Sequence, residues 1–278
     1  MSLTRRQTVT ALLTLPLPLA LTATPASAHG SGPGRARPRT LHIAGDSTAA
    51  AKSAEAAPET GWGMALPFFL SRHFRVANHA VNGRSSKSFI DEGRLDALLG
   101  GVRPGDLLLV QFGHNDEKTG DPDRGTDPYT TYQEHLRQYV RGARARQARP
   151  VLLTSVERRR FAPDGTARPT HGEYPAAMRA LAAEEGVPLL DLQALSLARW
   201  QQLGPDGTLP LFLWLKPGES PNHPDGKEDN THFRPPGAVD VARMTARALL
   251  DEGVLAARDL RRLKDPIPDE WITWGRPD

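Results

Sequence analysis

Short apolar runs alternate with amphipathic segments along most of this chain, and this alternation restricts the fold more than any other feature. The clearest run, DLLLVQF at residues 106–112, has almost no polar break, as is typical of strands covered on both faces. Further strand-like runs occupy residues 41–45, 74–81, 151–156 and 187–191. Helical patterns between them occupy residues 61–70, 89–99, 129–146 and 175–185. Regular alternation of strands and helices predicts a parallel sheet with helices on both faces.

We therefore expect an α/β fold over residues 40–255: a single-domain, three-layer α/β/α sandwich on a flavodoxin-like, doubly wound parallel sheet of five strands. Residues 205–234 interrupt the rhythm with scattered Pro, Gly, Asp and Asn, and are expected to form a long irregular segment with a functional role. Two prolines open a last helix at residues 235–251. We expect residues 256–278 to form a tail that packs back over the domain.

The first 28 residues have the form of an export signal. An Arg-Arg pair precedes an apolar stretch at residues 9–21, and Ala-Ser-Ala at residues 26–28 has the small-x-small form of a cleavage site. Paired arginines are typical of the bacterial twin-arginine route. A retained membrane anchor is the weaker interpretation, because the apolar stretch is short and contains two prolines. We expect cleavage near His29, a flexible lead-in at residues 29–39, and a secreted, extracellular protein.

The charge and the cysteine content exclude several classes of function. The formal charge of the 278 residues is +3, and the Arg-Arg pair of the export signal supplies two of these charges, which leaves +1 for the mature protein. That charge is too small to indicate binding to nucleic acid or to a membrane surface. The chain has no cysteine, which rules out disulfides, a thiolate nucleophile and zinc–thiolate sites. We expect a monomer with no cofactor, no metal and no stable membrane association.

Polar residues stand at the ends of three predicted strands and again just before the last helix. Ser47 ends the first strand, Gly83 follows the second, and Asn115 follows the third. Asp229 and His232 come shortly before the last helix. Because the carboxyl ends of parallel strands meet at one rim of a doubly wound sheet, we expect these five residues to lie close together.

Together these residues satisfy the needs of a serine nucleophile. A serine hydroxyl needs a base within hydrogen-bonding reach, and the base needs a carboxylate to orient it. In Asp229-x-x-His232 a tight turn lets the carboxylate accept the Nδ1 proton, so that Nε2 faces Ser47. Taken singly, Ser47 reads as a helix cap, and the Asp-His pair reads as a turn residue beside a surface histidine.

Acyl transfer also requires hydrogen-bond donors for the oxyanion. The backbone N–H groups of Ser47 and Gly83 and the side-chain amide of Asn115 are the natural set of donors at this rim. Alone, Gly83 is an ordinary turn glycine and Asn115 an ordinary loop residue.

Four sequence blocks in this order resemble those of the SGNH (GDSL-like) hydrolases, a superfamily named after a serine, a glycine, an asparagine and a histidine. The blocks are Gly45-Asp46-Ser47, Asn82-Gly83, Gly113-x-Asn115-Asp116 and Asp229-x-x-His232. The resemblance extends from about residue 40 to about residue 250. The segments GDSTA, NxAVNGRSS and QFGHND are most similar to those of the rhamnogalacturonan acetylesterases, which are secreted enzymes that remove acetyl groups from pectin backbones.

The resemblance implies the roles of individual residues. Ser47 would be the nucleophile, His232 the base and Asp229 its orienting carboxylate. The oxyanion donors would be Ser47 N–H, Gly83 N–H and Asn115 Nδ2. Asp46 and Asp116 are expected to hold the turns in place, whereas Arg84 and His114 are candidates for contact with substrate.

Other interpretations are weaker. A nucleotide- or phosphate-binding domain lacks any G-x-G-x-x-G or G-x-x-x-x-G-K-[ST] loop, and an α/β-hydrolase lacks its G-x-S-x-G elbow. A cation site is conceivable in the acidic stretch before the last helix, but its spacing matches no standard zinc or EF-hand pattern. The residues of that stretch are His223, Asp225, Glu228, Asp229 and His232.

A non-catalytic carbohydrate-binding relative is a further alternative, and the intact set of four blocks argues against it. Three aromatic residues in loops or near strand ends, Trp62, Trp214 and Tyr129, either stack on sugar rings or pack the rim.

The expected function is therefore that of a secreted serine esterase. It would remove O-acetyl groups from plant cell-wall polysaccharide, above all acetylated rhamnogalacturonan, through an acyl-serine intermediate. Its partner would be an acetylated polysaccharide or oligosaccharide. Acetylated xylan, another small ester, or the substrate of a lipase or thioesterase of the same superfamily are the alternatives that the sequence leaves open.

Overall fold

The computed structural model describes residues 37–275. The predicted export signal and most of the predicted lead-in lie outside these residues. Within them, Arg39 is not part of a lead-in, because it is the first residue of strand β1 (Arg39–Gly45) and pairs with Phe74. The main body of the chain therefore begins slightly earlier than the sequence pattern indicates.

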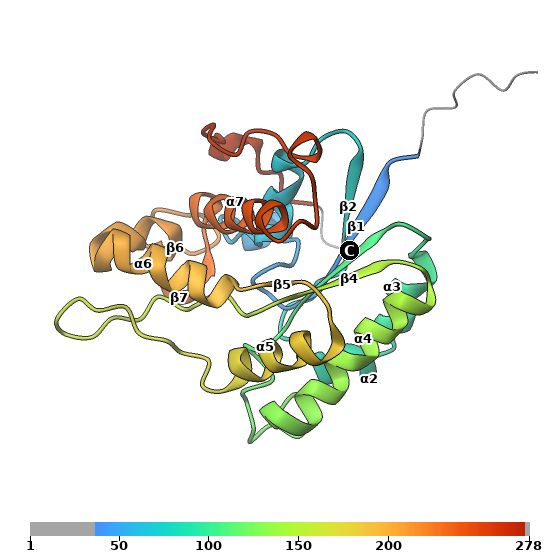
Figure 1. Cartoon of the computed structure of the whole chain (residues 1–278). Helices are drawn as coiled ribbons and strands as arrows, with labels where there is room; N and C mark the ends of the chain where they lie inside the picture. The colour runs from blue at the N-terminus through green and yellow to red at the C-terminus, as the bar shows by residue number, and fades with distance from the viewer. Residues whose placement is uncertain (1–36, 276–278) are drawn as a thin grey trace, which may run out of the picture. The chain divides into compact units, whose positions relative to one another are not determined.

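The centre of the fold is a parallel five-stranded sheet in the order β2-β1-β3-β4-β5 (Figure 1). Besides β1 its strands are β2 (Phe74–Asn78), β3 (Leu107–Gln111), β4 (Arg149–Leu153) and β5 (Leu189–Leu190). The strand order reverses between β1 and β3, as in other doubly wound sheets. The predicted five-stranded parallel α/β sandwich is confirmed.

Alternate residues of each strand face opposite layers of helices. Leu41, Ile43 and Leu109 point to one face, whereas Leu108 and Val110 point to the other, and all five are fully buried. Burial on both faces explains why the strand sequences are apolar almost throughout. The sheet is thereby held rigidly, with the carboxyl ends of its strands on one rim.

Two helical layers cover the sheet (Figure 1). On one face lie α2 (Ser86–Asp91), α3 (Arg94–Gly101), a π-helical turn (Pro128–Tyr132), α4 (Gln133–Ala145) and α5 (Tyr174–Glu185). On the other face lie α1 (Trp62–Ala65), α6 (Leu192–Thr208) and α7 (Pro235–Asp251). Short 3-10 turns occupy Ala54–Ala56, Leu66–Phe69 and Leu209–Leu211.

Two predicted helices are broken in the structure. The segment at residues 61–70 consists of α1 followed by a 3-10 turn, with Pro67 near the start of that turn. The segment at residues 89–99 is divided between α2 and α3 at Gly93, whose φ of 70° lies in the left-handed region that glycine adopts without strain. The apolar pattern is continuous across both breaks, so periodicity does not reveal them.

The prediction of an irregular segment at residues 205–234 is wrong. Helix α6 continues through Gly204 and Pro205 across a kink at Gly204 (φ 71°, ψ 178°). A second, antiparallel sheet then follows, formed by β6 (Phe212–Leu215) and β7 (Lys227–Phe233). The sequence is misleading here because the Pro, Gly and Asp residues lie at the kink and in the connection between the strands, and not throughout the segment.

The described part of the C-terminal tail packs on the domain. Leu260, Ile267 and Ile272 are buried in the same core as α7. Two 3-10 turns, Ala257–Asp259 and Asp269–Trp271, shape this segment. Trp274 Nε1 donates a 2.8 Å hydrogen bond to the Glu59 carbonyl, which ties the end of the tail to the loop after β1. Across residues 37–275, no helix combines the length and the apolar character needed to cross a bilayer.

Candidate active site

Ser47, His232 and Asp229 form a hydrogen-bonded chain at the carboxyl rim of the sheet. Ser47 Oγ lies 2.8 Å from His232 Nε2, and His232 Nδ1 lies 2.8 Å from Asp229 Oδ2. Ser47 follows β1, whereas the other two residues lie on β7, so that 185 positions of sequence separate the hydroxyl from the imidazole. The geometry is that of a nucleophile, a base and an orienting carboxylate.

Strand β7 holds the Asp-His pair. The predicted tight turn is instead the final part of this strand, in which Asp229 Oδ1 accepts the N–H groups of Thr231 at 2.7 Å and His232 at 3.0 Å. Partial burial raises the pKa of Asp229, but the His232 ring and these two N–H groups outweigh burial and hold it well below its usual value. The carboxylate is therefore charged, and its Oδ2 is directed at the imidazole.

Ser47, Gly83 and Asn115, the predicted sources of the oxyanion donors, each follow a strand of the central sheet at its carboxyl end. Gly83 has a φ of 76°, which glycine adopts readily in a tight turn. Within residues 37–275, neither Ser47 N–H nor Gly83 N–H has a hydrogen-bond partner, so both are available to a substrate oxygen. Asn115 Nδ2 donates to the Arg84 carbonyl at 3.0 Å, and Lys118 Nζ donates to Asn115 Oδ1 at 2.8 Å. The ammonium of Lys118 can only donate, so the atom of Asn115 that it contacts must be the amide oxygen. The N–H₂ group of Asn115 therefore points away from Lys118.

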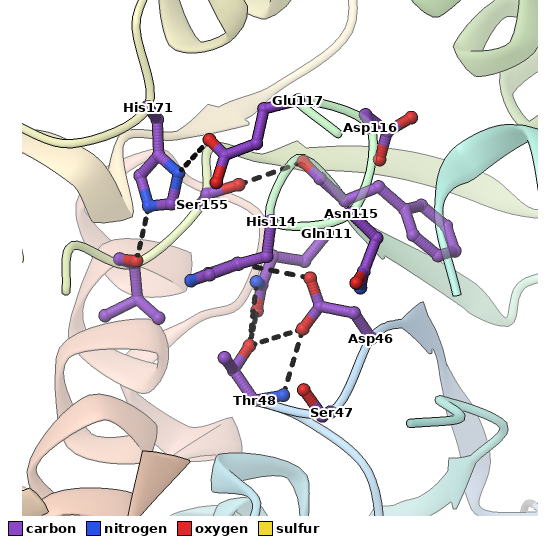
Figure 2. A network of polar contacts seen from close by, with 12 residues as sticks. Asp46, Ser47, Thr48, Gln111, His114, Asn115, Asp116, Glu117, Ser155 and His171 are labelled. Carbon is purple, nitrogen blue, oxygen red and sulfur yellow. Dashed lines mark hydrogen bonds and ion pairs between the residues drawn. The ribbon is translucent and has the colours of Figure 1, made fainter. Parts of the chain in front are cut away.

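Asp46 braces the turn that presents the nucleophile (Figure 2). Its Oδ1 accepts the N–H of Thr48 at 2.9 Å and the Thr48 hydroxyl at 2.7 Å, and its Oδ2 lies 3.2 Å from His114 Nδ1. Burial raises the pKa of Asp46, but the His114 ring and the Thr48 donors hold it at about 2. A buried, charged carboxylate thus fixes the backbone on both sides of Ser47.

His114 is buried, which disagrees with its prediction as a contact of the substrate. Its exposed fraction is 4%, and its ring packs edge-on against His171 with 4.4 Å between the ring centroids. Burial lowers the pKa of His114 to about 4, so the ring is neutral at neutral pH and its Nδ1–H donates to Asp46. His114 therefore supports the turn that carries Ser47, through its contact with Asp46.

Asp116 supports the turn after β2 from below. It is fully buried, it accepts the Ser86 N–H at 3.0 Å and the Ser86 hydroxyl, and it thereby holds the first turn of α2 just after Gly83 and Arg84. Burial raises the pKa of Asp116 to about 7, although the hydrogen bonds from Ser86 act in the opposite direction. The folded protein therefore retains this proton far above the usual range of an aspartate.

Asp116 should make stability depend on pH. Between about pH 4 and about pH 7 the unfolded chain has lost this proton whereas the folded chain keeps it, so the stability contributed by Asp116 falls as the pH rises. The change from 3.8 to about 7 corresponds to roughly 4 kcal/mol. Asp116→Asn cannot ionise, and the free energy of unfolding of this variant, measured in urea, should fall less than that of the wild type between about pH 5 and about pH 8. Equal pH dependence in the two proteins would contradict this assignment.

Of the two interpretations of Trp62, stacking on a sugar ring or packing, the structure favours packing. Its side chain is fully buried under the nucleophile turn, and its Nε1 donates to Gln111 Oε1 at 2.6 Å. Tyr129 is 51% exposed, but its hydroxyl donates to Glu173 on the loop before α5. Trp214 is partly exposed beside β7, where its Nε1 donates to Asn230 Oδ1 at 3.0 Å.

Arg84 lies next to the oxyanion turn but is already engaged. Its Nε donates to both carboxylate oxygens of Glu92 at 3.1 Å, and its Nη1 donates to the Asn82 carbonyl at 2.8 Å. These bonds turn its guanidinium toward α2 and the Asn82-Gly83 turn. Its contact with substrate stays a prediction.

Lys52 is a residue of this region that the sequence does not single out. The side chain is only 1% exposed, and its Nζ donates to Asn82 Oδ1 at 2.6 Å and pairs with Glu59 Oε1 at 2.6 Å. Asn82 immediately precedes Gly83, so a buried cation anchors the turn that carries one oxyanion donor. A lysine in a loop ordinarily reads as a solvated residue, and no pattern in the sequence distinguishes this one.

The acidic stretch before α7 does not assemble a cation site. Among the residues that the structure describes, no group of three or more His, Asp or Glu side chains has an arrangement that could hold a metal ion. Of this stretch, Asp229 instead contacts His232, and His232 contacts Ser47.

Removing the Asn115 amide should slow the reaction without unfolding the protein. Asn115→Ala should lower kcat by about 10²- to 10³-fold, because one of three donors to the oxyanion is lost in the transition state. The control variant is Asn222→Ala, which removes an exposed amide that donates to the Ala54 and Ala57 carbonyls in the loop region before α1. A loss of less than about threefold would remove Asn115 from the oxyanion site.

Comparison with known families indicates ester hydrolysis. The model of the GDSL-like lipase/acylhydrolase family matches residues 43–238, which include Ser47, Gly83, Asn115, Asp229 and His232. Rhamnogalacturonan acetylesterase RhgT of Bacillus subtilis is 45% identical over 217 residues, which are 78% of this chain and 92% of that protein. The probable rhamnogalacturonan acetylesterase YesY of the same organism is 38% identical over 77% of this chain and 94% of its own length.

A solved structure shares the fold. The crystal structure of Bacillus subtilis protein YxiM superposes with a TM-score of 0.67 at 30% sequence identity. The match covers 78% of this chain and 57% of the YxiM chain, so this protein corresponds to a little over half of that one.

Proposed function

The chain belongs to the GDSL-like lipase/acylhydrolase family, and from that premise we propose that it is a serine acetylesterase that removes acetyl groups from acetylated rhamnogalacturonan. Membership confirms the superfamily predicted from the four sequence blocks, and it makes the protein a carboxylic ester hydrolase. The substrate and the catalytic roles of the individual residues are the proposed part.

The proposed mechanism follows from the hydrogen-bonded chain at the rim. His232 Nε2 takes the proton of Ser47 Oγ as this oxygen attacks the acetyl carbonyl carbon. Asp229 stabilises the imidazolium that forms, and the three donors stabilise the oxyanion. The sugar oxygen leaves with the proton from His232, which gives acetyl-Ser47 and a free sugar hydroxyl. Water, deprotonated by His232, then attacks the acetyl carbonyl carbon, and acetate is released as His232 returns the proton to Ser47 Oγ.

The observation that carries the proposal is the 2.8 Å approach of Ser47 Oγ to His232 Nε2, with Asp229 Oδ2 on the other ring nitrogen. The choice of substrate is supported by the relatives. Both RhgT and YesY are named for rhamnogalacturonan, and each aligns with this chain over more than nine-tenths of its own length.

A panel of esters tests the substrate. Purified protein should release acetate from acetylated rhamnogalacturonan with a kcat/KM at least about tenfold above that for acetylated xylan. Among nitrophenyl esters, the rate should fall as the acyl chain lengthens beyond acetyl. A preference for long acyl chains would show a lipase instead, and a preference for acetylated xylan would transfer the proposal to that polymer.

We also propose that the protein is exported before it acts. The support is the Arg-Arg pair, the apolar stretch and the Ala-Ser-Ala sequence within residues 1–28. A polymeric substrate that cannot enter the cell requires an enzyme outside it. N-terminal sequencing of protein recovered from the culture medium should begin near His29, and recovery with residues 1–28 intact would contradict cleavage.

A further inference from the structure

A cavity of about 520 Å³ adjoins β7, the strand that carries Asp229 and His232. It is lined by Arg158, Arg159, Arg160, Phe161, Thr170 and Asn230. Asn230 is the neighbour of Asp229 on β7, and the Arg159 N–H donates to its carbonyl at 2.8 Å. One residue that lines the cavity, Asn230, is therefore the sequence neighbour of Asp229.

The same arginine segment also reaches the oxyanion side of the site. Arg158 Nη2 lies 3.5 Å from the carbonyl of His114, the residue before Asn115. The arginine segment thus contacts both β7 and the loop that carries Asn115.

The positive charge around this cavity is only partly balanced. Arg158 pairs with Glu117, whose other oxygen lies 3.0 Å from His171 Nδ1 (Figure 2 shows the Glu117–His171 contact). Arg159 and Arg160 have no carboxylate partner within residues 37–275. Neither guanidinium forms an ion pair with the described protein; burial lowers the pKa of Arg159, and the nearby Asp206 carboxylate raises it.

Arg159 and Arg160 differ in the hydrogen bonds of their side chains. Arg159 is fixed by neutral acceptors, because its Nε donates to Thr208 Oγ1 at 3.1 Å and its Nη2 to the Pro205 carbonyl at 2.8 Å. Its guanidinium also lies 5.1 Å from the centre of the Trp214 ring. Arg160 is exposed and has no side-chain hydrogen bond to the described residues, so its guanidinium is free to bind a ligand.

A third cation stands near the oxyanion site. Lys118 donates only to the neutral Asn115 Oδ1 and forms no ion pair with the described residues. Burial lowers the pKa of Lys118, and the positive charges of Arg124 and Arg158 lower it further. Lys118 is thus a further cation near Asn115, although the carboxylates of Asp121 and Glu117 are close enough to raise its pKa.

We propose that this cavity binds the carboxylate of an acidic sugar residue of the substrate chain, with Arg160 as its direct contact. This inference rests on the proposed function, and it gives a reason for choosing an acidic polymer over a neutral polymer such as xylan. Guanidinium matches the two oxygens of a carboxylate, and Arg159 adds fixed positive charge behind it. Thr170 and Asn230 offer hydroxyl and amide groups to the sugar.

Binding to a variant that cannot turn over substrate tests the cavity separately from catalysis. In Ser47→Ala protein, titration calorimetry with an unacetylated rhamnogalacturonan oligosaccharide should give measurable affinity that falls as salt is added. Arg160→Gln in the same background should weaken this binding about tenfold, because a charged hydrogen-bonded contact is lost. Arg160→Lys should lose less, because the charge is kept.

The matched control is Arg141→Gln. Arg141 is an exposed arginine of α4 that does not line the cavity, so its removal changes the net charge equally without touching the proposed contact. It should leave the affinity unchanged. An equal loss from Arg141→Gln and Arg160→Gln, or no loss from Arg160→Gln, would overturn the proposal. So would equal binding of a neutral xylo-oligosaccharide.

A failure of the cavity assignment can be distinguished from a failure of the proposed function. If wild-type protein releases no acetate from acetylated rhamnogalacturonan while Arg160→Gln still weakens binding of the acidic oligosaccharide, the function is wrong and the cavity assignment holds. If acetate is released and the affinity does not respond to Arg160, the function holds and the cavity assignment is wrong.

Discussion

Ser47→Ala and His232→Ala should each lower kcat for 4-nitrophenyl acetate by about 10⁵- to 10⁶-fold, and the double variant should be no slower than either single one. The reason is that the hydroxyl and the imidazole, 2.8 Å apart, act as a unit: without the base the serine is a weak nucleophile, and without the serine the base has no proton to take. Steady-state kinetics of the three variants provides the test.

The control for this pair is Ser71→Ala, which removes a serine hydroxyl from the loop before β2, away from the site. It should leave kcat unchanged, and all variants should unfold at similar temperatures. Additive losses in the double variant would mean that Ser47 and His232 act independently, and the hydrogen-bonded chain would then not be the catalytic device.

Asp229→Asn should lower kcat by about 10⁴-fold while the protein stays folded. The asparagine keeps an oxygen for the N–H groups of Thr231 and His232, so the end of β7 should persist. Its amide cannot accept the Nδ1 proton from the position of Oδ2, so His232 would be held in the wrong tautomer and its imidazolium would lose a counter-charge. KM should change little, because Asp229 acts through His232 and not on the substrate.

The kinetic effect of Asp229→Asn can be separated from a structural one. Asp191→Asn replaces another partly buried carboxylate, which pairs with Arg179 at the end of β5. It should affect stability more than kcat. A loss of less than about tenfold in Asp229→Asn would show that His232 does not need this carboxylate.

The fold was predictable because the sheet is buried on both faces. The inner strands β1, β3 and β4 are apolar along most of their length, and the residues that follow each run mark the rim. Ser47, Gly83 and Asn115 therefore fall at the ends of β1, β2 and β3, where the alternation of strands and helices places them. Strand order and exact helix breaks were not available from the same pattern.

The hairpin of β6 and β7 was not predictable, because the sequence of β7 is not typical of a strand and its backbone contacts alone make it one. Most residues of β7 are polar and at least partly exposed, and the strand is held by its pairing with β6 and by the N–H groups of Thr60 and Arg159. Thr60 and Arg159 are far from β7 in sequence, and the connection between β6 and β7 is rich in Pro and Gly. The Asp-x-x-His spacing identified the pair, but the strand that carries it depends on distant backbone contacts.

Burial was the other property that the sequence did not reveal. Trp62 and His114 have side chains suited to sugar recognition, yet both are buried and bond to Gln111 and Asp46 beside the turn that carries Ser47. Gly113 shows the same crowding, because a Cβ at this position would overlap the Ser155 hydroxyl. Side chains next to catalytic residues are here mainly supports.

Locating the residue modified by an ester that cannot be turned over tests the central claim most directly. Diethyl 4-nitrophenyl phosphate should inactivate the protein with one diethylphosphoryl group per molecule, and peptide mass spectrometry should place that group on Ser47. His232→Ala protein should react far more slowly, because the hydroxyl then lacks its base. Inactivation with the label on another residue, or full activity with Ser47 labelled, would contradict the account.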